Sequence, residues 1–135
     1  MALRVSVNCL LDTCALIWLV NGAPELSPAA RAACGQAGAN VFVSAISAWE
    51  LALKLARRKL RLRKALPDWW AEAIARHHLA ELPVSASIAI RSVGLEPLHA
   101  DPADRVLIAT AQEHGLNLLT PDPVIAKYSS LKVLW

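Results

Sequence analysis

Five acidic side chains occupy positions at which a solvated surface charge is not the natural explanation. They are Asp12, Glu50, Asp101, Asp104 and Asp122. Each follows an expected strand, begins an expected helix or lies at the edge of an apolar helix face. Carboxylates that meet in one place raise one another's pKa unless a cation joins them, and Mg²⁺ or Mn²⁺ prefers such oxygen ligands. The set therefore predicts a site for a divalent metal ion.

Three of these acids also have a purely structural explanation when each is considered alone. Asp12 could accept the first amides of a helix that begins at residue 13. Glu50 could form an ion pair with Lys54, four residues further along a helix. Asp122 lies between two prolines and could be a turn residue. These alternatives stay open for the single positions, so the metal prediction depends on the set.

Asp101 and Asp104 stand in the stretch DPAD, where an apolar helical pattern begins. With Asp101 as the N-cap, Pro102 becomes the first helical residue and Asp104 the third, which suits the free amides and the helix dipole. Capping needs only one good acceptor, and a second carboxylate beside it adds repulsion. We therefore predict that Asp101 caps the helix and is a further candidate ligand, and that Asp104 is a metal ligand.

Zinc suits this chain less well than a hard ion does. His77 and His78 are adjacent on an expected helix and point in different directions, whereas His99 and His114 stand alone. The cysteines form no C-x-x-C pair, so the sequence lacks the usual zinc-ligand spacing. Buried free thiols in a reducing cytoplasm are expected for Cys9, Cys14 and Cys34.

Apolar periodicity predicts an alternation of strands and helices along the chain. Strands are expected over 5–12, 40–44, 116–120 and 132–135. Helices are expected over 13–22, 28–37, 44–60, 66–79, 86–93 and 102–114, with an extended link at 80–85. This alternation predicts an α/β fold, a three-layer α/β/α sandwich with a central parallel sheet, in one domain over residues 1–135.

The helix expected over 44–60 carries one of the five acids. Ser44 or Ser47 is expected to begin it. The stripe that we expect to face the core consists of Ile46, Trp49, Leu53 and Ala56. Glu50 follows Trp49 by about 100° of rotation, so it lies at the edge of that stripe.

The composition argues against a membrane protein but is compatible with a protein partner. The most apolar early run, CLLDTCALIWLV, has 12 residues and contains Asp12, whereas a spanning helix needs about 20 apolar residues. Residues 1–10 alternate like a strand, so no signal peptide is expected. Hydrophobic residues make up 56% of the chain, so part of the apolar surface is expected to be buried against a second copy or another chain.

The order of five motifs resembles that of the PIN-domain family, and is most similar to the VapC-type toxins of bacterial toxin–antitoxin pairs. The motifs are LLDTCALIWLVNG, VSAISAWELALKLARRKLRL, DPADRVLIATA, LLTPD and LKVLW. The similarity covers nearly the whole chain. It implies a PIN-like parallel α/β/α fold, metal-dependent cleavage of RNA by a cluster of acids, a cognate antitoxin and a homodimer.

The resemblance assigns roles residue by residue. The catalytic and metal-binding acids would be Asp12, Glu50, Asp104 and Asp122, with Asp101 as a fifth metal ligand and Mg²⁺ or Mn²⁺ as the ion. The hydroxyls of Thr13 and Thr120 would orient a carboxylate or a water. The closest subgroup has phenylalanine in place of Ala103 and usually histidine in place of Cys14, and neither departure removes a ligand.

A basic run, KLARRKLRLRK, covers residues 54–64 and contains seven of the fourteen Lys and Arg residues. It could be a solvated helix end, with cations near the negative pole of the dipole. Alternatively, it forms a phosphate-binding rim beside Glu50. On the second interpretation, the RNA-binding residues are Lys54, Arg57, Arg58 and Arg61.

Other classes of protein fit less well. A non-catalytic PIN-like RNA-binding module would keep the fold and lose acids, but all four motif acids are present. A phosphoaspartyl phosphatase would need an aspartate two residues after Asp12, where this chain has Cys14. A receiver module would use Asp12 with a central phospho-acceptor, which Glu50 on a helix does not supply. The sequence therefore favours the metal-dependent endoribonuclease.

Overall fold

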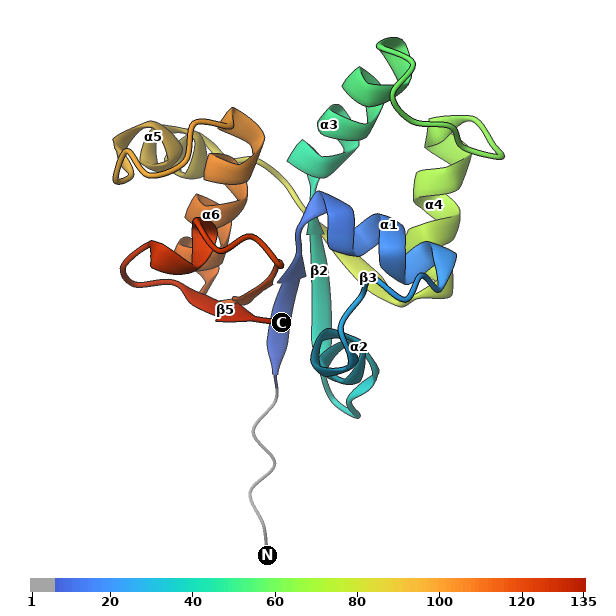
Figure 1. The fold of residues 1–135 in the computed structure, drawn as a ribbon, viewed down its shortest axis with the longest axis horizontal. Helices are drawn as coiled ribbons and strands as arrows, with labels where there is room; N and C mark the ends of the chain where they lie inside the picture. The colour runs from blue at the N-terminus through green and yellow to red at the C-terminus, as the bar shows by residue number, and fades with distance from the viewer. Residues whose placement is uncertain (1–6) are drawn as a thin grey trace, which may run out of the picture.

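The computed structural model describes residues 7–135, and its strands form one parallel sheet (Figure 1). The strand order is β3-β2-β1-β4-β5, and every neighbouring pair is parallel. The first strand therefore lies at the centre, between the second and the fourth. The bounds are β1 (Asn8–Leu11), β2 (Asn40–Ser44), β3 (Leu79–Leu82), β4 (Asn117–Leu119) and β5 (Lys132–Leu134). Residues 5 and 6 of the strand predicted over 5–12 lie outside the described residues.

Within residues 7–135, six α-helices connect the strands and cover both faces of the sheet (Figure 1). A short 3₁₀ helix (Ile125–Lys127) precedes the last strand. None of the helices within residues 7–135 is long and apolar enough to cross a membrane. The bounds are α1 (Thr13–Asn21), α2 (Pro28–Gly35), α3 (Ala45–Ala56), α4 (Leu66–Arg76), α5 (Ala86–Gly94) and α6 (Pro102–His114).

The side chains of β1 alternate between two hydrophobic cores, which makes the three layers. Cys9 and Leu11 pack in the cluster that contains buried residues of α1, α2 and α4. Leu10 packs in the other cluster, with Leu107 and Ile108 of α6. All three strand residues are fully buried, as expected for the central strand of a parallel sheet. The predicted three-layer α/β/α sandwich with a central parallel sheet is confirmed.

The edge strand β3 was not predicted. The apolar pattern predicts a helix up to residue 79 and a link over 80–85, whereas α4 ends at Arg76 and Leu79–Leu82 pairs with β2. Leu79 is buried, but Ala80 and Glu81 are exposed, so the segment lacks a clear apolar alternation. Its pairing with β2 makes it a strand, and that pairing is not visible in the local pattern.

The long helix α3 differs from its prediction at its end and on its face. It stops at Ala56, because Arg58 adopts a left-handed conformation with φ of 56°. The amide of Lys59 then donates to the carbonyl of Lys54 and that of Arg58 to Leu55, the pattern of a Schellman motif. No glycine marks this end, so the apolar pattern predicts a helix that continues to residue 60.

The predicted core stripe of α3 is wrong at Trp49 and Ala56, which are exposed, whereas Ile46 is half-buried against the core. Trp49 is 51% exposed, whereas Ser47 and Leu51 are fully buried. The helix is therefore rotated about its axis relative to the prediction. Ser47 accepts a hydrogen bond from Thr13, and this buried polar contact does not register in an apolar pattern. The rotation turns Glu50 and Lys54 toward the carboxyl end of the sheet, where both line a cavity.

Candidate active site

A cavity of about 350 Å³ opens at the carboxyl end of the central strands. Because Leu11 of β1 is paired with Leu119 of β4, Asp12 and Thr120 follow side by side. Glu50 reaches the cavity from α3, and the α6 start and the loop after β4 supply the rest. All five predicted acids line it: Asp12, Glu50, Asp101, Asp104 and Asp122.

Asp12 is the most deeply buried of the five, with 6% of its surface exposed. Its Oδ1 accepts a 2.7 Å hydrogen bond from the amide of Ala15, so it also caps α1. Burial raises the pKa of Asp12, the hydrogen bonds from Thr120 and Ala15 lower it, and the charges of nearby acids raise it further. The net shift is upward, so the site disfavours the ionised form of Asp12.

Asp101 and Asp104 divide their roles at the start of α6. Oδ1 of Asp101 accepts hydrogen bonds from the amides of Ala103 at 2.8 Å and Asp104 at 3.2 Å, which confirms the predicted cap. Burial raises the pKa of Asp104 to about 7, with the charge of Asp101 as the second cause. Near neutral pH, Asp104 is therefore partly protonated in the absence of a cation.

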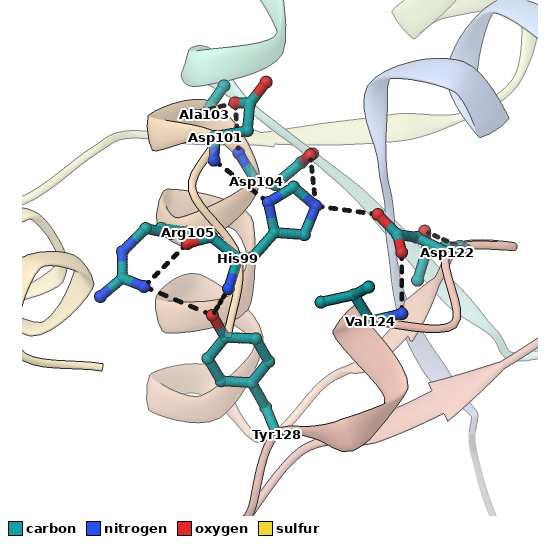
Figure 2. Close-up of polar contacts among 9 residues, drawn as sticks. His99, Asp101, Ala103, Asp104, Arg105, Asp122, Val124 and Tyr128 are labelled. Carbon is teal, nitrogen blue, oxygen red and sulfur yellow. Dashed lines mark hydrogen bonds and ion pairs between the residues drawn. The ribbon is translucent and has the colours of Figure 1, made fainter. Parts of the chain in front are cut away.

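Asp122 is the acid that the protein itself stabilises as a carboxylate. Its Oδ1 accepts from the amide of Val124 at 2.9 Å, and its Oδ2 lies 2.9 Å from Nε2 of His99 (Figure 2). Burial opposes its ionisation, but the hydrogen bonds from His99, Val124 and Ile125 outweigh burial and lower the pKa of Asp122. Asp122 therefore carries a negative charge across the neutral range.

His99 is the site residue that the sequence analysis missed. It was treated as an isolated histidine, yet its Nε2 also lies 3.2 Å from Oδ2 of Asp104. The ligand atoms of His99, Asp104 and Asp122 all lie within 4.8 Å of one another. Its place two residues before Asp101 was the available signal.

Both threonines line the cavity, but their hydroxyls have different partners. Thr120 contacts two of the acids. Its hydroxyl donates a hydrogen bond to the Asp12 carboxylate and accepts one from the amide of Asp122 at 3.2 Å. Thr13 donates instead to Ser47, at 2.9 Å, in the buried interior. Thr13 therefore joins α1 to α3 through a partner that no sequence pattern indicates.

Cys14 also lines the cavity. Burial raises the pKa of its thiol, and the charge of Asp12 raises it further, although Lys54 opposes both. A thiol in this setting stays protonated near neutral pH, and only a thiolate is a good metal ligand. Cys14 is therefore a neutral part of the wall.

The basic run does not form one rim. Lys54 lines the acidic cavity, and Arg57 and Arg58 are exposed just beyond the end of α3. Arg61 lines a second cavity of about 540 Å³, between α1, residues 60–64 and α4. The early end of α3 causes this separation, because the chain turns away after Ala56.

The donors of the acidic cavity suit a hard divalent cation. Carboxylate oxygens predominate, and burial, together with the charges of neighbouring acids, raises the pKa values of Asp12 and Asp104. A cation among these groups would favour their ionised forms. Mg²⁺ and Mn²⁺ both prefer such oxygen-rich sites.

The acid-lined cavity lies outside the carboxyl ends of a parallel sheet, which is where α/β proteins bind their ligands. The sequence also matches the family model of the PIN domain over residues 9–131, and the chain belongs to this family. It is 36% identical over 115 residues to Ribonuclease VapC22 of Mycobacterium tuberculosis, covering 84% of this chain and 85% of the relative.

Solved structures share the fold at lower identity. VapBC2 from Rickettsia felis, bound to a DNA fragment from their promoter, aligns with a TM-score of 0.69 at 15% identity, over 94% of this chain and 97% of that one. A toxin–antitoxin complex from Klebsiella pneumoniae aligns with a TM-score of 0.58 at 23% identity, over 91% and 94% of the two chains. These matches show that the fold is shared.

Proposed function

We propose that this protein is a metal-dependent endoribonuclease that hydrolyses RNA phosphodiesters and acts as the toxin of a toxin–antitoxin pair. The observation that carries the proposal is the convergence of five carboxylates, from distant parts of the chain, on one cavity. The similarity to a relative named as a ribonuclease supports the same reaction. The cytoplasm, where RNA is available, is the proposed location.

In this proposal, Asp12, Glu50, Asp104 and Asp122 hold the metal, and Asp101 contributes the oxygen that the cap leaves free. Bound Mg²⁺ or Mn²⁺ would lower the pKa of a water and neutralise charge that develops on the phosphate. Asp12 directly follows the central strand β1 and is held by the Ala15 amide and by Thr120, so its carboxylate is fixed in position.

The substrate would reach this site over the exposed end of α3. Lys54 lines the acidic cavity, and Arg57 and Arg58 extend the positive charge outward from it. Cations that lie beside a hydrolytic site would bind the phosphates that flank the cleaved bond. Arg61 belongs to the second cavity and would contact RNA less directly.

A protein partner would regulate the enzyme. The structural neighbours include a toxin–antitoxin complex from Klebsiella pneumoniae, which supports an antitoxin as partner. We also propose a homodimer, since α5 exposes Ile90 at 74% and Val93 at 82%, and α3 exposes Trp49. Light scattering of the purified chain tests this part, and a monomer at micromolar concentration contradicts it.

Incubation of the purified protein with total RNA tests the activity. With Mg²⁺ or Mn²⁺, we expect fragments with defined ends, and we expect EDTA to abolish cleavage and added metal to restore it. Mapping of the cut sites then identifies the target. Cleavage that persists in EDTA, or an absence of cleavage with both metals, would contradict the proposal.

A further inference from the structure

We infer that His99 is a positioning residue of the acidic site: its Nε2–H group holds the carboxylates of Asp122 and Asp104 at the spacing that a divalent ion needs. This inference rests on the proposed function, because it assigns a role within the same metal site. His99 lies on the loop before α6 and is not one of the five predicted acids. Its side chain is 16% exposed.

The backbone around His99 determines which ring nitrogen carries the proton. The amide of Asp101 donates to Nδ1 of His99 at 3.1 Å. An N–H at Nδ1 would face that donor, so Nδ1 must be the acceptor. An acceptor at Nδ1 leaves the ring N–H at Nε2, so the ring offers the acids a donor rather than a metal-binding lone pair.

The Nε2–H group is hydrogen-bonded to Asp122 and lies close to Asp104. Figure 2 shows the ring between Asp104 and Asp122, with Nε2 at 3.2 Å from one Oδ2 and 2.9 Å from the other. Each carboxylate oxygen can accept more than one contact, so the bond to His99 leaves lone pairs for a cation. Partners of this kind orient metal ligands and tune their affinity.

The backbone of His99 is itself held from two directions. Its amide donates to the Tyr128 hydroxyl at 2.7 Å, and its carbonyl accepts from Nη1 of Arg105 at 3.0 Å (Figure 2). Arg105 also donates to the carbonyls of Ser92, Val93, Leu95 and Glu96. The loop is therefore tied to α5 and α6, which restricts where the imidazole can lie.

Two substitutions separate the two nitrogens of His99. His99→Asn places an amide oxygen near the position of Nδ1, so it keeps an acceptor for the Asp101 amide and removes the donor to the acids. His99→Gln places an amide nitrogen near the position of Nε2, so it keeps that donor and removes the acceptor. A residue that only supports the loop would tolerate Asn better than Gln.

Titration calorimetry with Mn²⁺, without RNA, measures the effect. We expect His99→Asn to weaken Mn²⁺ binding by about 10- to 100-fold, the usual cost of losing such a partner. We expect His99→Gln to bind more like the wild type, and both variants to stay folded. The imidazole ¹⁵N and ¹³C shifts of the metal-free wild type should show the Nε2–H tautomer.

Three results would overturn the role of His99. They are unchanged or tighter Mn²⁺ binding by His99→Asn, an equal loss in both variants, or an Nδ1–H tautomer. Tighter binding would mean that the ring occupies the place of the ion. Wild-type protein that neither binds Mn²⁺ nor cleaves RNA contradicts the proposed function itself, which distinguishes the two failures.

Discussion

Thr13 donates a 2.9 Å hydrogen bond to Ser47 in the buried interior, and this bond joins the first residue of α1 to the face of α3 that carries Glu50. Ser47 precedes Glu50 by three residues, so both lie on the same side of the helix. Asp12 directly precedes Thr13. The bond therefore ties together the two elements that supply these acids.

Ser47→Ala is expected to destabilise the fold by about 1–3 kcal/mol, because it leaves the buried hydroxyl of Thr13 without an acceptor. The double variant Thr13→Val with Ser47→Ala removes both polar groups and should recover much of the loss. Urea denaturation of the two variants measures this. A double variant that is less stable than Ser47→Ala would show that the hydrogen bond is not the cause.

Asp12→Asn should abolish RNA cleavage while α1 keeps its cap, since asparagine caps a helix as well as aspartate does. Asp12→Ala should also lose cleavage and be about 1 kcal/mol less stable than Asp12→Asn. A cleavage assay with Mg²⁺ and thermal melting separate the two roles. Wild-type cleavage by Asp12→Asn would exclude Asp12 from the proposed site.

The stability of the metal-free protein should fall as pH rises toward neutrality because of Asp104. Its pKa is about 7 in the folded protein against an ordinary value of 3.8. The folded state therefore binds the proton more tightly, and the stability that this confers is complete below 3.8 and lost as pH rises through about 7. Each unit of difference corresponds to about 1.4 kcal/mol.

Melting temperatures measured across this range, for the wild type and Asp104→Asn, isolate the effect, because Asp12, whose pKa is also raised, and Asp122, whose pKa is lowered, are present in both proteins. The difference between the two proteins should change with pH between 3.8 and about 7. Mg²⁺ should stabilise the wild type most above that range, where Asp104 is ionised. A difference that stays constant with pH would contradict the assignment.

Arg58→Gly is expected to stabilise the protein by roughly 0.5–1 kcal/mol, because glycine adopts a left-handed conformation without the cost that a side chain incurs. Arg57 is a matched control, since its φ of −89° suits any residue, and Arg57→Gly should be neutral or destabilising. Chemical denaturation compares the two. A loss of stability in Arg58→Gly would mean that its side chain makes a compensating contact.

Lys54→Met should weaken RNA binding more than Arg61→Met, because Lys54 lines the acidic cavity and Arg61 lines the second one. Each lost phosphate contact should reduce the slope of log K against log salt by about 0.7 for a single strand. Binding of a short RNA by catalytically inactive Asp12→Asn protein, at several salt concentrations, provides the measurement. Equal effects of the two substitutions would favour a rim that spans both cavities.

The sequence by itself determined those elements whose first and last residues are marked by capping or helix-ending residues. Helix α6 spans 102–114 as predicted, since Asp101 and Pro102 define its start and Gly115, in a left-handed conformation, defines its end. Strand β2 likewise matches the predicted 40–44. The five acids could be selected in the same way, because each stands at an element boundary or beside an apolar stripe.

Only the tertiary structure decided which of these signals act together. Strand β3 forms because it pairs with β2. Helix α3 ends at Ala56 in a turn without glycine, so the sequence does not indicate this end. His99 enters the site because Arg105 and Tyr128 hold its loop against the acids. Caps and turns depend on neighbours in sequence and can be predicted, whereas strand pairing, helix rotation and ring placement depend on contacts between segments far apart.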